Sequence, residues 1–143
     1  RGSSAAPQRD KFEKTAIAWA RTNKVPIFAV CRGLQMINMV LGGSMSTTEG
    51  HVGKDHFLNR TSASAPDWLK TMPAHFEVNS FHSFAIGVNQ MAPGLVAAAI
   101  DKENHVEAAF HESERIGAIM WHPERLNPAH ELDSAMISGF FGK

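Results

Sequence analysis

The chain has 143 residues, a length that suits one domain, and its 14 Lys and Arg residues balance its 14 Asp and Glu residues. This balance gives no net field that would gather nucleic acid or an acidic membrane surface, so we expect neither partner. One cysteine excludes an intramolecular disulfide and favours a reducing compartment.

Residues 1–9 are expected to be a flexible lead-in to a single domain over residues 10–143. The lead-in begins RGSSAAPQ, which is rich in small residues and contains a proline. It lacks the apolar core of a signal peptide, and no apolar run in the chain reaches the roughly 20 residues that span a bilayer. We therefore expect a cytoplasmic protein.

A surface helix is predicted from Asp10, ending near Asn23 and Lys24, because apolar residues recur there every three or four positions. These residues form one stripe on the helix, as expected for the side that faces a core. The stripe consists of Phe12, Ala16, Trp19 and Ala20.

A buried strand and a second helix follow directly. Residues 25–30 (VPIFAV) are almost wholly apolar, which is typical of a strand covered on both faces of a parallel sheet. The next pattern is helical from Arg32 to about Leu41 and ends at Gly42 and Gly43. This order of helix, buried strand and helix indicates an α/β fold.

The remaining elements are predicted from shorter patterns. Residues 44–66 are polar and indicate a loop with a strand near 56–60, and residues 68–72 suggest a short helical turn. Strands are predicted at 76–79, 95–100, 105–111 and 116–121, and a closing helix at 129–140. The strands at 95–100 and 105–111 should form a hairpin.

The only cysteine, Cys31, stands where the buried strand meets the second helix. A sharp strand-to-helix turn exposes one side chain above the sheet and requires small neighbours, here Ala29 and Gly33. The helix N-terminus favours a thiolate, and the backbone N–H of Arg32 would point at an oxyanion. A lone cysteine is more often a small buried apolar residue, but the turn pattern favours a nucleophile.

A second chemical segment is Trp-His-Pro-Glu at residues 121–124, at the end of an apolar run. Since side chains alternate along extended chain, His122 and Glu124 can point to the same side. A carboxylate beside a histidine orients a general base. The alternative is a capping histidine with a solvated glutamate, yet with Cys31 the pair completes the set that an activated thiol requires.

Three motifs occur along the chain in the order Cys-Arg-Gly-Leu-Gln (31–35), Val-Asn-Ser-Phe-His (78–82) and Trp-His-Pro-Glu (121–124). Together they resemble the class I glutamine amidotransferase family, which has a Cys-His-Glu triad on a flavodoxin-like, mostly parallel sheet. The resemblance extends over about residues 10–141 and is nearest to the γ-glutamyl hydrolase branch, peptidase family C26. Within this branch, softer similarity points to a subgroup linked to surface polysaccharides that includes γ-glutamyl-CDP-amidate hydrolase; γ-glutamyl-γ-aminobutyrate hydrolase belongs to the same branch.

The resemblance implies a role for each matching residue. Cys31 is the nucleophile, His122 the base and Glu124 its partner. The pocket for the glutamyl group would be lined by Gln35, Asn79, Ser80 and Phe81. The reaction implied is hydrolysis of a γ-glutamyl amide through a γ-glutamyl thioester, with neither cofactor nor metal.

The chain departs from the family pattern in two places. Ala29 stands where the family usually has glycine, and the family's first strands, which supply a second oxyanion donor, are not found. Loss of one such donor typically lowers the rate about 100- to 1000-fold, so we expect weak or no activity from this chain alone. The alternatives are the glutaminase subunit of a synthase pair and a non-catalytic glutamine-binding relative, and a homo-oligomer or a synthase partner stays open.

The other polar residues are given simpler roles. His51 and His56, with Glu49 and Asp55 nearby, could ligate zinc, but a tetrahedral site needs three or four ligands in fixed geometry. We therefore expect the two histidines to shape the mouth of the pocket or to face water. Arg32 could meet an anionic group of a substrate or face solvent. His82 is expected beside the site without acting as the base. The large aromatic residues are assigned to the core or the pocket wall: Phe81, Phe84, Trp121, Phe140 and Phe141.

Overall fold

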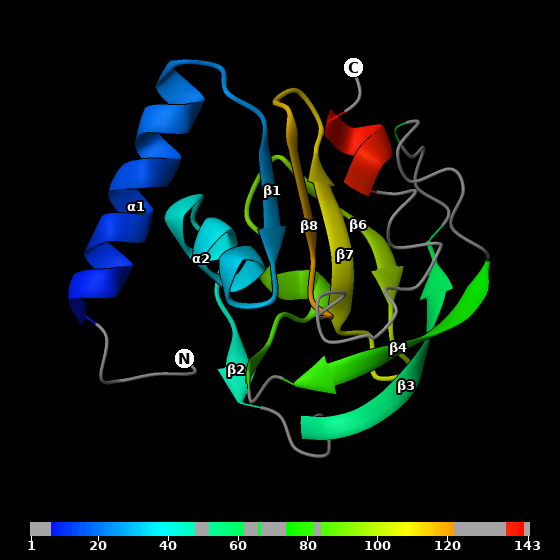
Figure 1. Ribbon diagram of the computed structural model, residues 1–143. Helices are drawn as coiled ribbons and strands as arrows, with labels where there is room; N and C mark the ends of the chain where they lie inside the picture. The colour runs from blue at the N-terminus through cyan, green and yellow to red at the C-terminus, as the bar shows by residue number, and fades with distance from the viewer. Residues whose placement is uncertain are drawn as a thin grey trace.

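The computed structural model describes two main helices and a curled sheet (Figure 1). The described residues are 7–47, 52–61, 66, 74–81, 84–121 and 137–141. The helices are α1 (Pro7–Thr22), α2 (Arg32–Val40) and the short 3-10 helix η2 (Val88–Gln90), and residues 137–141 are also helical. The strands are β1 (Ile27–Val30), β2 (Ser46–Thr47), β3 (Val52–Arg60), β4 (His75–Phe81), β5 (Phe84–Ala85), β6 (Leu95–Ile100), β7 (Val106–His111) and β8 (Ile116–Ile119). None of the described helices is long and apolar enough to cross a membrane.

The main sheet has six strands in the order β1-β8-β7-β6-β3-β4, and β2 pairs with β5 in a small second sheet. The expected α/β class is confirmed, whereas "mostly parallel" is wrong for the described strands. Only β1 and β8 run parallel, and the other pairings in this sheet are antiparallel. The predicted hairpin of β6 and β7 is confirmed, and its short connection forces the antiparallel direction.

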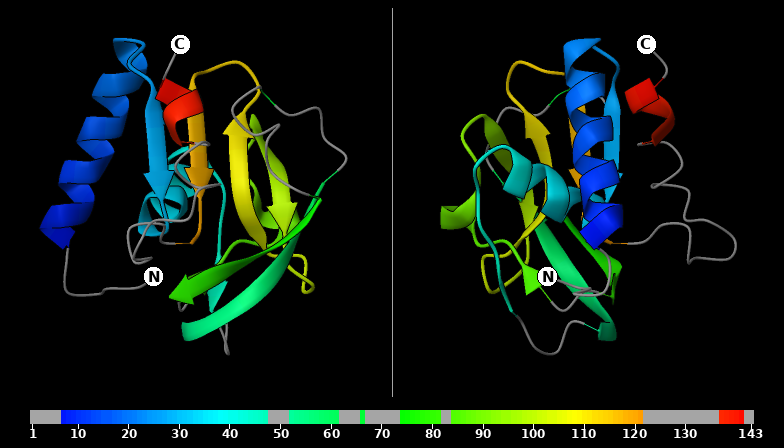
Figure 2. Two further views of the ribbon diagram at one scale, coloured as in Figure 1. Left: turned by 45° about the vertical axis from the view of Figure 1, so that its right-hand side comes forward. Right: turned by 90° about the vertical axis from the view of Figure 1, so that its left-hand side faces the viewer.

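Apolar side chains cover both faces of the sheet. One core cluster joins α2 to β1 and β8 and includes Leu34, Ile37 and Ala118. The other cluster lies on the opposite face, where Phe140 packs against Phe28 with ring centroids 5.2 Å apart. Figure 2 shows α2 and the helical residues 137–141 on opposite sides of β1. The sheet is therefore the middle layer, and the last part of the predicted closing helix is confirmed.

The predicted apolar stripe of α1 is confirmed at Ala20 and wrong at its other three positions, because the helix turns a different face inward. Phe12 and Trp19 are 73% and 60% exposed, and Ala16 is exposed as well, whereas Ile17 and Ala20 are buried. On the inner face Asp10 and Glu13 form ion pairs with Arg32 at the start of α2. This charge pairing brings the polar positions of α1 toward α2 and leaves the larger apolar side chains outside.

Most predicted strand positions are confirmed with shifted ends. The helix α1 begins at Pro7, since proline is well suited to a first helical turn. The segment over residues 44–66 contains β2 and all of β3, and β3 is longer than the predicted strand near 56–60. Neither β5 nor η2 was predicted, because each is too short to show a periodic pattern. The predicted turn at 68–72 lies outside the described residues.

Asn38, fully buried in α2, joins three separate backbone groups. Its Nδ2 donates to the carbonyl oxygens of Ser44 and Gln90 at 2.9 and 3.1 Å, and its Oδ1 accepts from the backbone N–H of Ala92 at 2.7 Å. Without the amide, the backbone N–H of Ala92 and the carbonyl oxygen of Ser44 would lose this bond, whereas Gln90 O would still accept from the backbone N–H of Ser44 at 3.0 Å. Asn38 therefore fixes the chain after α2 to the segment that follows η2.

We expect Asn38→Leu to destabilise the protein by about 3 kcal/mol, because the substitution keeps the branched shape of the side chain but leaves buried polar groups unsatisfied. Urea unfolding measures the difference. The exposed Asn89 provides a matched control, and Asn89→Leu should change the free energy of unfolding by less than about 0.5 kcal/mol. Equal effects of the two substitutions would contradict the role of Asn38.

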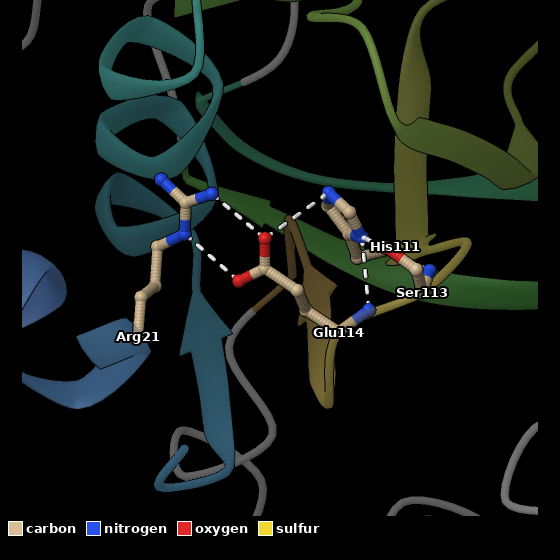
Figure 3. A network of polar contacts seen from close by, with 4 residues as sticks. All are labelled: Arg21, His111, Ser113 and Glu114. Atoms are coloured by element: carbon tan, nitrogen blue, oxygen red, sulfur yellow. Dashed lines mark hydrogen bonds and ion pairs between the residues drawn. The ribbon is translucent and has the colours of Figure 1, made fainter. Parts of the chain in front are cut away.

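A polar network ties the end of α1 to the turn between β7 and β8 (Figure 3). Arg21 donates from Nε and Nη2 to the two carboxylate oxygens of Glu114, at 2.8 and 2.7 Å. His111 accepts hydrogen bonds at Nδ1 from the backbone N–H groups of Ser113 and Glu114, at 3.1 and 3.0 Å. The Arg21 side chain, chiefly through its hydrogen bonds, lowers the pKa of the Glu114 carboxyl.

A lowered folded-state pKa means that Glu114 stabilises the protein above its unfolded pKa and that this contribution is lost as the pH falls through the folded value. We expect Glu114→Gln to reduce the free energy of unfolding by about 0.5 kcal/mol at pH 7, since both partners are about one third exposed. The difference between the two proteins should therefore be smaller at pH 3 than at pH 7. Urea unfolding at the two pH values tests this, and a difference that persists undiminished at pH 3 would show that the ion pair is not its cause.

Candidate active site

Cys31 lies at the turn between β1 and α2 in a conformation that is unusual for a residue with a side chain. Its backbone has φ 51° and ψ −103°, and the residue is only 6% exposed. A non-glycine residue in such a region costs of order 1–3 kcal/mol and is held by the surrounding structure. The backbone N–H of Cys31 donates to Ile119 O at 2.7 Å, and Cys31 O accepts from the backbone N–H of Gln35 at 3.2 Å. The turn is therefore fixed on both sides.

The close contact between β1 and α2 explains the small residues that flank Cys31. A Cβ atom added at Gly33 would lie 3.0 Å from the Cβ of Ala29. The expected requirement for small neighbours is therefore met by these two positions together. Glycine at 33 allows alanine at 29, the position where the sequence departs from its family pattern.

The C-terminal ends of β1 and β8 lie side by side at one end of the sheet. Val30 pairs in register with Ile119, and both strands run in the same direction (Figure 1). The described chain continues from Ile119 to Trp121, which is 1% exposed. His122 and Glu124 lie outside the described residues, so their placement stays a prediction.

Arg32 directs its side chain toward α1. Its guanidinium pairs with the Asp10 carboxylate through Nη2, and Nε lies 3.5 Å from Glu13 Oε1. The Arg32 side chain is 19% exposed, so it is not a solvated arginine. Its backbone N–H is at the first position of α2, directly after Cys31. The side chain thus links the two helices, and the predicted oxyanion role, which concerns the backbone N–H alone, stays a prediction.

Gln35 connects the cysteine helix to two other parts of the site region. The side chain is 6% exposed, and its Nε2 donates to Phe84 O at 3.3 Å and lies 3.8 Å from Met120 Sδ. Phe84, whose carbonyl oxygen accepts this hydrogen bond, is three residues after Phe81, the last residue of the Asn-Ser-Phe block.

The backbone of the Asn-Ser-Phe block belongs to β4. Asn79, Ser80 and Phe81 pair in antiparallel register with residues of β3, and their side chains lie outside the description. The substrate-binding roles of Gln35 and of this block stay predictions.

Among the described residues, one group of metal-binding side chains comes together, at the β6–β7 hairpin. The ligand atoms of Asp101, Glu103 and His105 lie within 4.8 Å of one another. Asp101 Oδ1 also accepts from the backbone N–H groups of Glu103 and His105, at 2.9 Å each, which is the bonding of a tight turn. The group therefore closes the hairpin. Of the histidines considered for zinc, His51 lies outside the described residues and His56 contributes only backbone.

Comparison with known proteins agrees with this architecture. A solved glutamine amidotransferase from Thermotoga maritima superposes with a TM-score of 0.73 at 15% sequence identity, covering 96% of this chain and 58% of that chain. The fold is thus that of the class I glutamine amidotransferases. The peptidase C26 family model matches residues 1–124, and the chain belongs to this family.

Two of the curated relatives illustrate the degree of similarity. The chain is 34% identical over 148 residues to Protein NtpR of Enterococcus hirae and 36% identical over 126 residues to the γ-glutamyl-CDP-amidate hydrolase of Campylobacter jejuni. The alignments cover 93% and 87% of this chain, but only 61% and 56% of those proteins. The chain therefore spans less than two thirds of the length of either relative.

The contact between Gly33 and Ala29 gives a direct test of the turn. We expect Gly33→Val to destabilise the protein by about 2 kcal/mol, because the added atoms collide with a strand that cannot move away. In an Ala29→Gly background the same substitution should cost less than half as much, since the colliding methyl group is gone. Denaturant unfolding of the four proteins measures the coupling. Fully additive effects would show that the two residues do not restrict each other.

Proposed function

We propose that the chain carries the thiol hydrolase site of an enzyme that cleaves γ-glutamyl amides, with Cys31 as nucleophile, His122 as general base and Glu124 as its partner. The observation that carries the proposal is the strained turn at Cys31, located where the parallel strands β1 and β8 end together. Strained backbone of this kind is concentrated at functional sites. The segment that follows β8 contains His122 and Glu124.

The first half of the reaction forms a covalent intermediate. The Cys31 thiolate, favoured by the N-terminal end of α2, attacks the γ-carbonyl carbon of the substrate. The oxyanion that develops accepts a hydrogen bond from the backbone N–H of Arg32. His122 then gives a proton to the departing amine, the C–N bond breaks, and a γ-glutamyl thioester to Cys31 remains.

The second half restores the enzyme. His122, now neutral, takes a proton from water, and the resulting hydroxide attacks the thioester carbonyl. The C–S bond breaks, glutamate is released, and the thiolate and imidazolium are regenerated. Glu124 orients the imidazole ring and stabilises its protonated form in both halves.

The substrate class follows from the family and from one relative. The Campylobacter jejuni relative is named for hydrolysis of a γ-glutamyl-CDP-amidate, and we extend the γ-glutamyl part of that name to this chain. Gln35 and the Asn79-Ser80-Phe81 block would line the glutamyl pocket, consistent with the hydrogen bond from Gln35 to Phe84 O. A γ-glutamyl-CDP-amidate from surface polysaccharide modification is a specific candidate substrate.

A panel of γ-glutamyl amides, including glutamine and a γ-glutamyl nucleotide amidate, tests this function by the release of glutamate. Cys31→Ala and His122→Gln should each lower the rate at least about a thousandfold, because each removes a member of a unit that acts together. His75→Gln is the matched control, since His75 is exposed on β4 far from Cys31 in the strand order, and it should leave the rate unchanged.

The outcomes distinguish three kinds of protein. Glutamate release that survives Cys31→Ala would reject the thiol mechanism. Turnover of glutamine alone, and only with an added synthase, would indicate a glutaminase subunit. Binding of γ-glutamyl compounds with no turnover of any of them would indicate a non-catalytic relative.

A further inference from the structure

The first turn of α2, directly after Cys31, lacks the local features that usually stabilise the start of a helix. Cys31 is in the N-cap position and makes no side-chain capping hydrogen bond, and the first turn contains no acidic residue. Arg32 occupies the first helical position, where a cation is unfavourable because of the helix dipole. The local sequence therefore does not account for the stability of this helix start.

Two carboxylates of α1 supply the missing negative charge from another part of the chain. Asp10 Oδ1 pairs with Arg32 Nη2, and Glu13 Oε1 lies 3.5 Å from Arg32 Nε. The three side chains are between 17% and 29% exposed, and partly buried charges interact more strongly than fully solvated ones. These ion pairs offset the unfavourable position of the Arg32 cation. Lys14 lines the same small cavity as Asp10 and Arg32 and brings the group of charges close to neutrality.

The N-terminal half of α1 depends on these ion pairs for its contact with α2. Among the described side chains of α1, only Ile17 and Ala20 are buried, and both lie in the C-terminal half of the helix. None of the described side chains before Ile17 is buried. The start of α1 is thus attached to the start of α2 through charge, not through apolar packing.

The turn at Cys31 needs support from both of its neighbours. Its strained backbone persists only where the surrounding structure holds it. On the side of the sheet, the Cys31 N–H is held by Ile119 O. On the side of the helix, the next residue is Arg32, whose side chain is held by α1. Gln35, whose N–H donates to Cys31 O, lines the same cavity as Asp10 and Arg32, so the ion pairs lie beside the candidate site.

We propose that Asp10 and Glu13 are positioning residues for Cys31: their ion pairs with Arg32 hold the first turn of α2 so that its N-terminal end stays aligned with the thiol. This inference rests on the proposed function. The free N–H groups and the dipole of a helix N-terminus favour a thiolate only while they are directed at the sulfur. Both carboxylates act through Arg32, and loss of the ion pairs makes the thiolate harder to form.

The test is the rate of alkylation by iodoacetamide at pH 7, which requires no substrate turnover and reports on Cys31 alone, because the chain has one cysteine. The double substitution Asp10→Asn/Glu13→Gln should lower this rate about fivefold, since less of the thiol is then ionised. Asp10→Glu keeps the charge and should stay within about twofold of the wild-type rate.

Two comparisons separate positioning from a general loss of stability. In an Arg32→Gln background, Asp10→Asn/Glu13→Gln should change the rate less than about twofold, because the partner of both carboxylates is already absent. Glu114→Gln is the matched control: it removes the ion pair at the other end of α1 and should leave the alkylation rate unchanged.

A faster reaction of Asp10→Asn/Glu13→Gln would overturn the proposal, because attraction of the thiolate by the released Arg32 cation, or easier access to a loosened turn, would then dominate. An equal decrease with and without Arg32 overturns it as well, and so does an unchanged rate. If the double variant does not fold cooperatively, Asp10→Asn alone undergoes the same cycle and should lower the rate about twofold only when Arg32 is present.

The outcomes for this proposal and for the proposed function are distinguishable. A wild-type protein that releases no glutamate from any γ-glutamyl amide, yet shows the coupling of the two carboxylates to Arg32, would fail the proposed function and retain the positioning role. Hydrolysis that requires Cys31, combined with no effect of Asp10→Asn/Glu13→Gln on alkylation, would have the opposite meaning.

Discussion

The parallel pairing of β1 with β8 is the interaction on which the candidate site depends. It aligns Val30 with Ile119, and the hydrogen bond from the Cys31 N–H to Ile119 O extends the pairing into the turn. Without this register, an unfavourable conformation at Cys31 would have no support from the sheet. The same pairing makes the chain emerge from β8 beside the thiol, and it is the only parallel pairing between described strands of the main sheet.

The two ends of the strands in the main sheet differ in their polar contacts. At the end away from Cys31, Arg21 and Glu114 link α1 to the β7–β8 turn through partly exposed charges, which contribute little stability. At the end that carries Cys31, the polar side chains of Gln35 and Glu107 are buried, and each is at most 6% exposed. Buried polar groups require specific partners, so they fix geometry more strictly than apolar packing does. Buried polar side chains at the end that carries Cys31 are consistent with a reactive centre there.

The sequence predicted those parts of the fold that depend on local pattern. A few consecutive residues were enough to predict the strand β1, the end of α2 at its glycines and the β6–β7 hairpin. The face of α1 was mispredicted because the ion pairs of Arg32 with Asp10 and Glu13 join residues about twenty positions apart. Periodicity cannot show such contacts, and it also assigned the exposed Phe12 and Trp19 to the core side.

The site was predictable to a similar extent. Cys31 could be singled out because the one cysteine stands between a buried strand and a helix, beside the small residues Ala29 and Gly33 that a sharp turn requires. Asn38 and Glu107 were not found, since a polar residue inside an apolar run gives no sign of its burial or of its partners. The register shift at Glu107 depends on how β6 and β7 pair, which a single sequence does not specify. His122 and Glu124 stay predictions.

The central claim is that Cys31 forms a covalent γ-glutamyl intermediate at the junction of β1 and α2. Rapid acid quenching during turnover of a γ-glutamyl amide, followed by intact-mass and peptide mass spectrometry, tests it most directly. The proposed mechanism predicts a mass increase of one γ-glutamyl group on the peptide that contains Cys31, absent from Cys31→Ala. Turnover without any modified Cys31 peptide, or with the γ-glutamyl group on another residue, would contradict it.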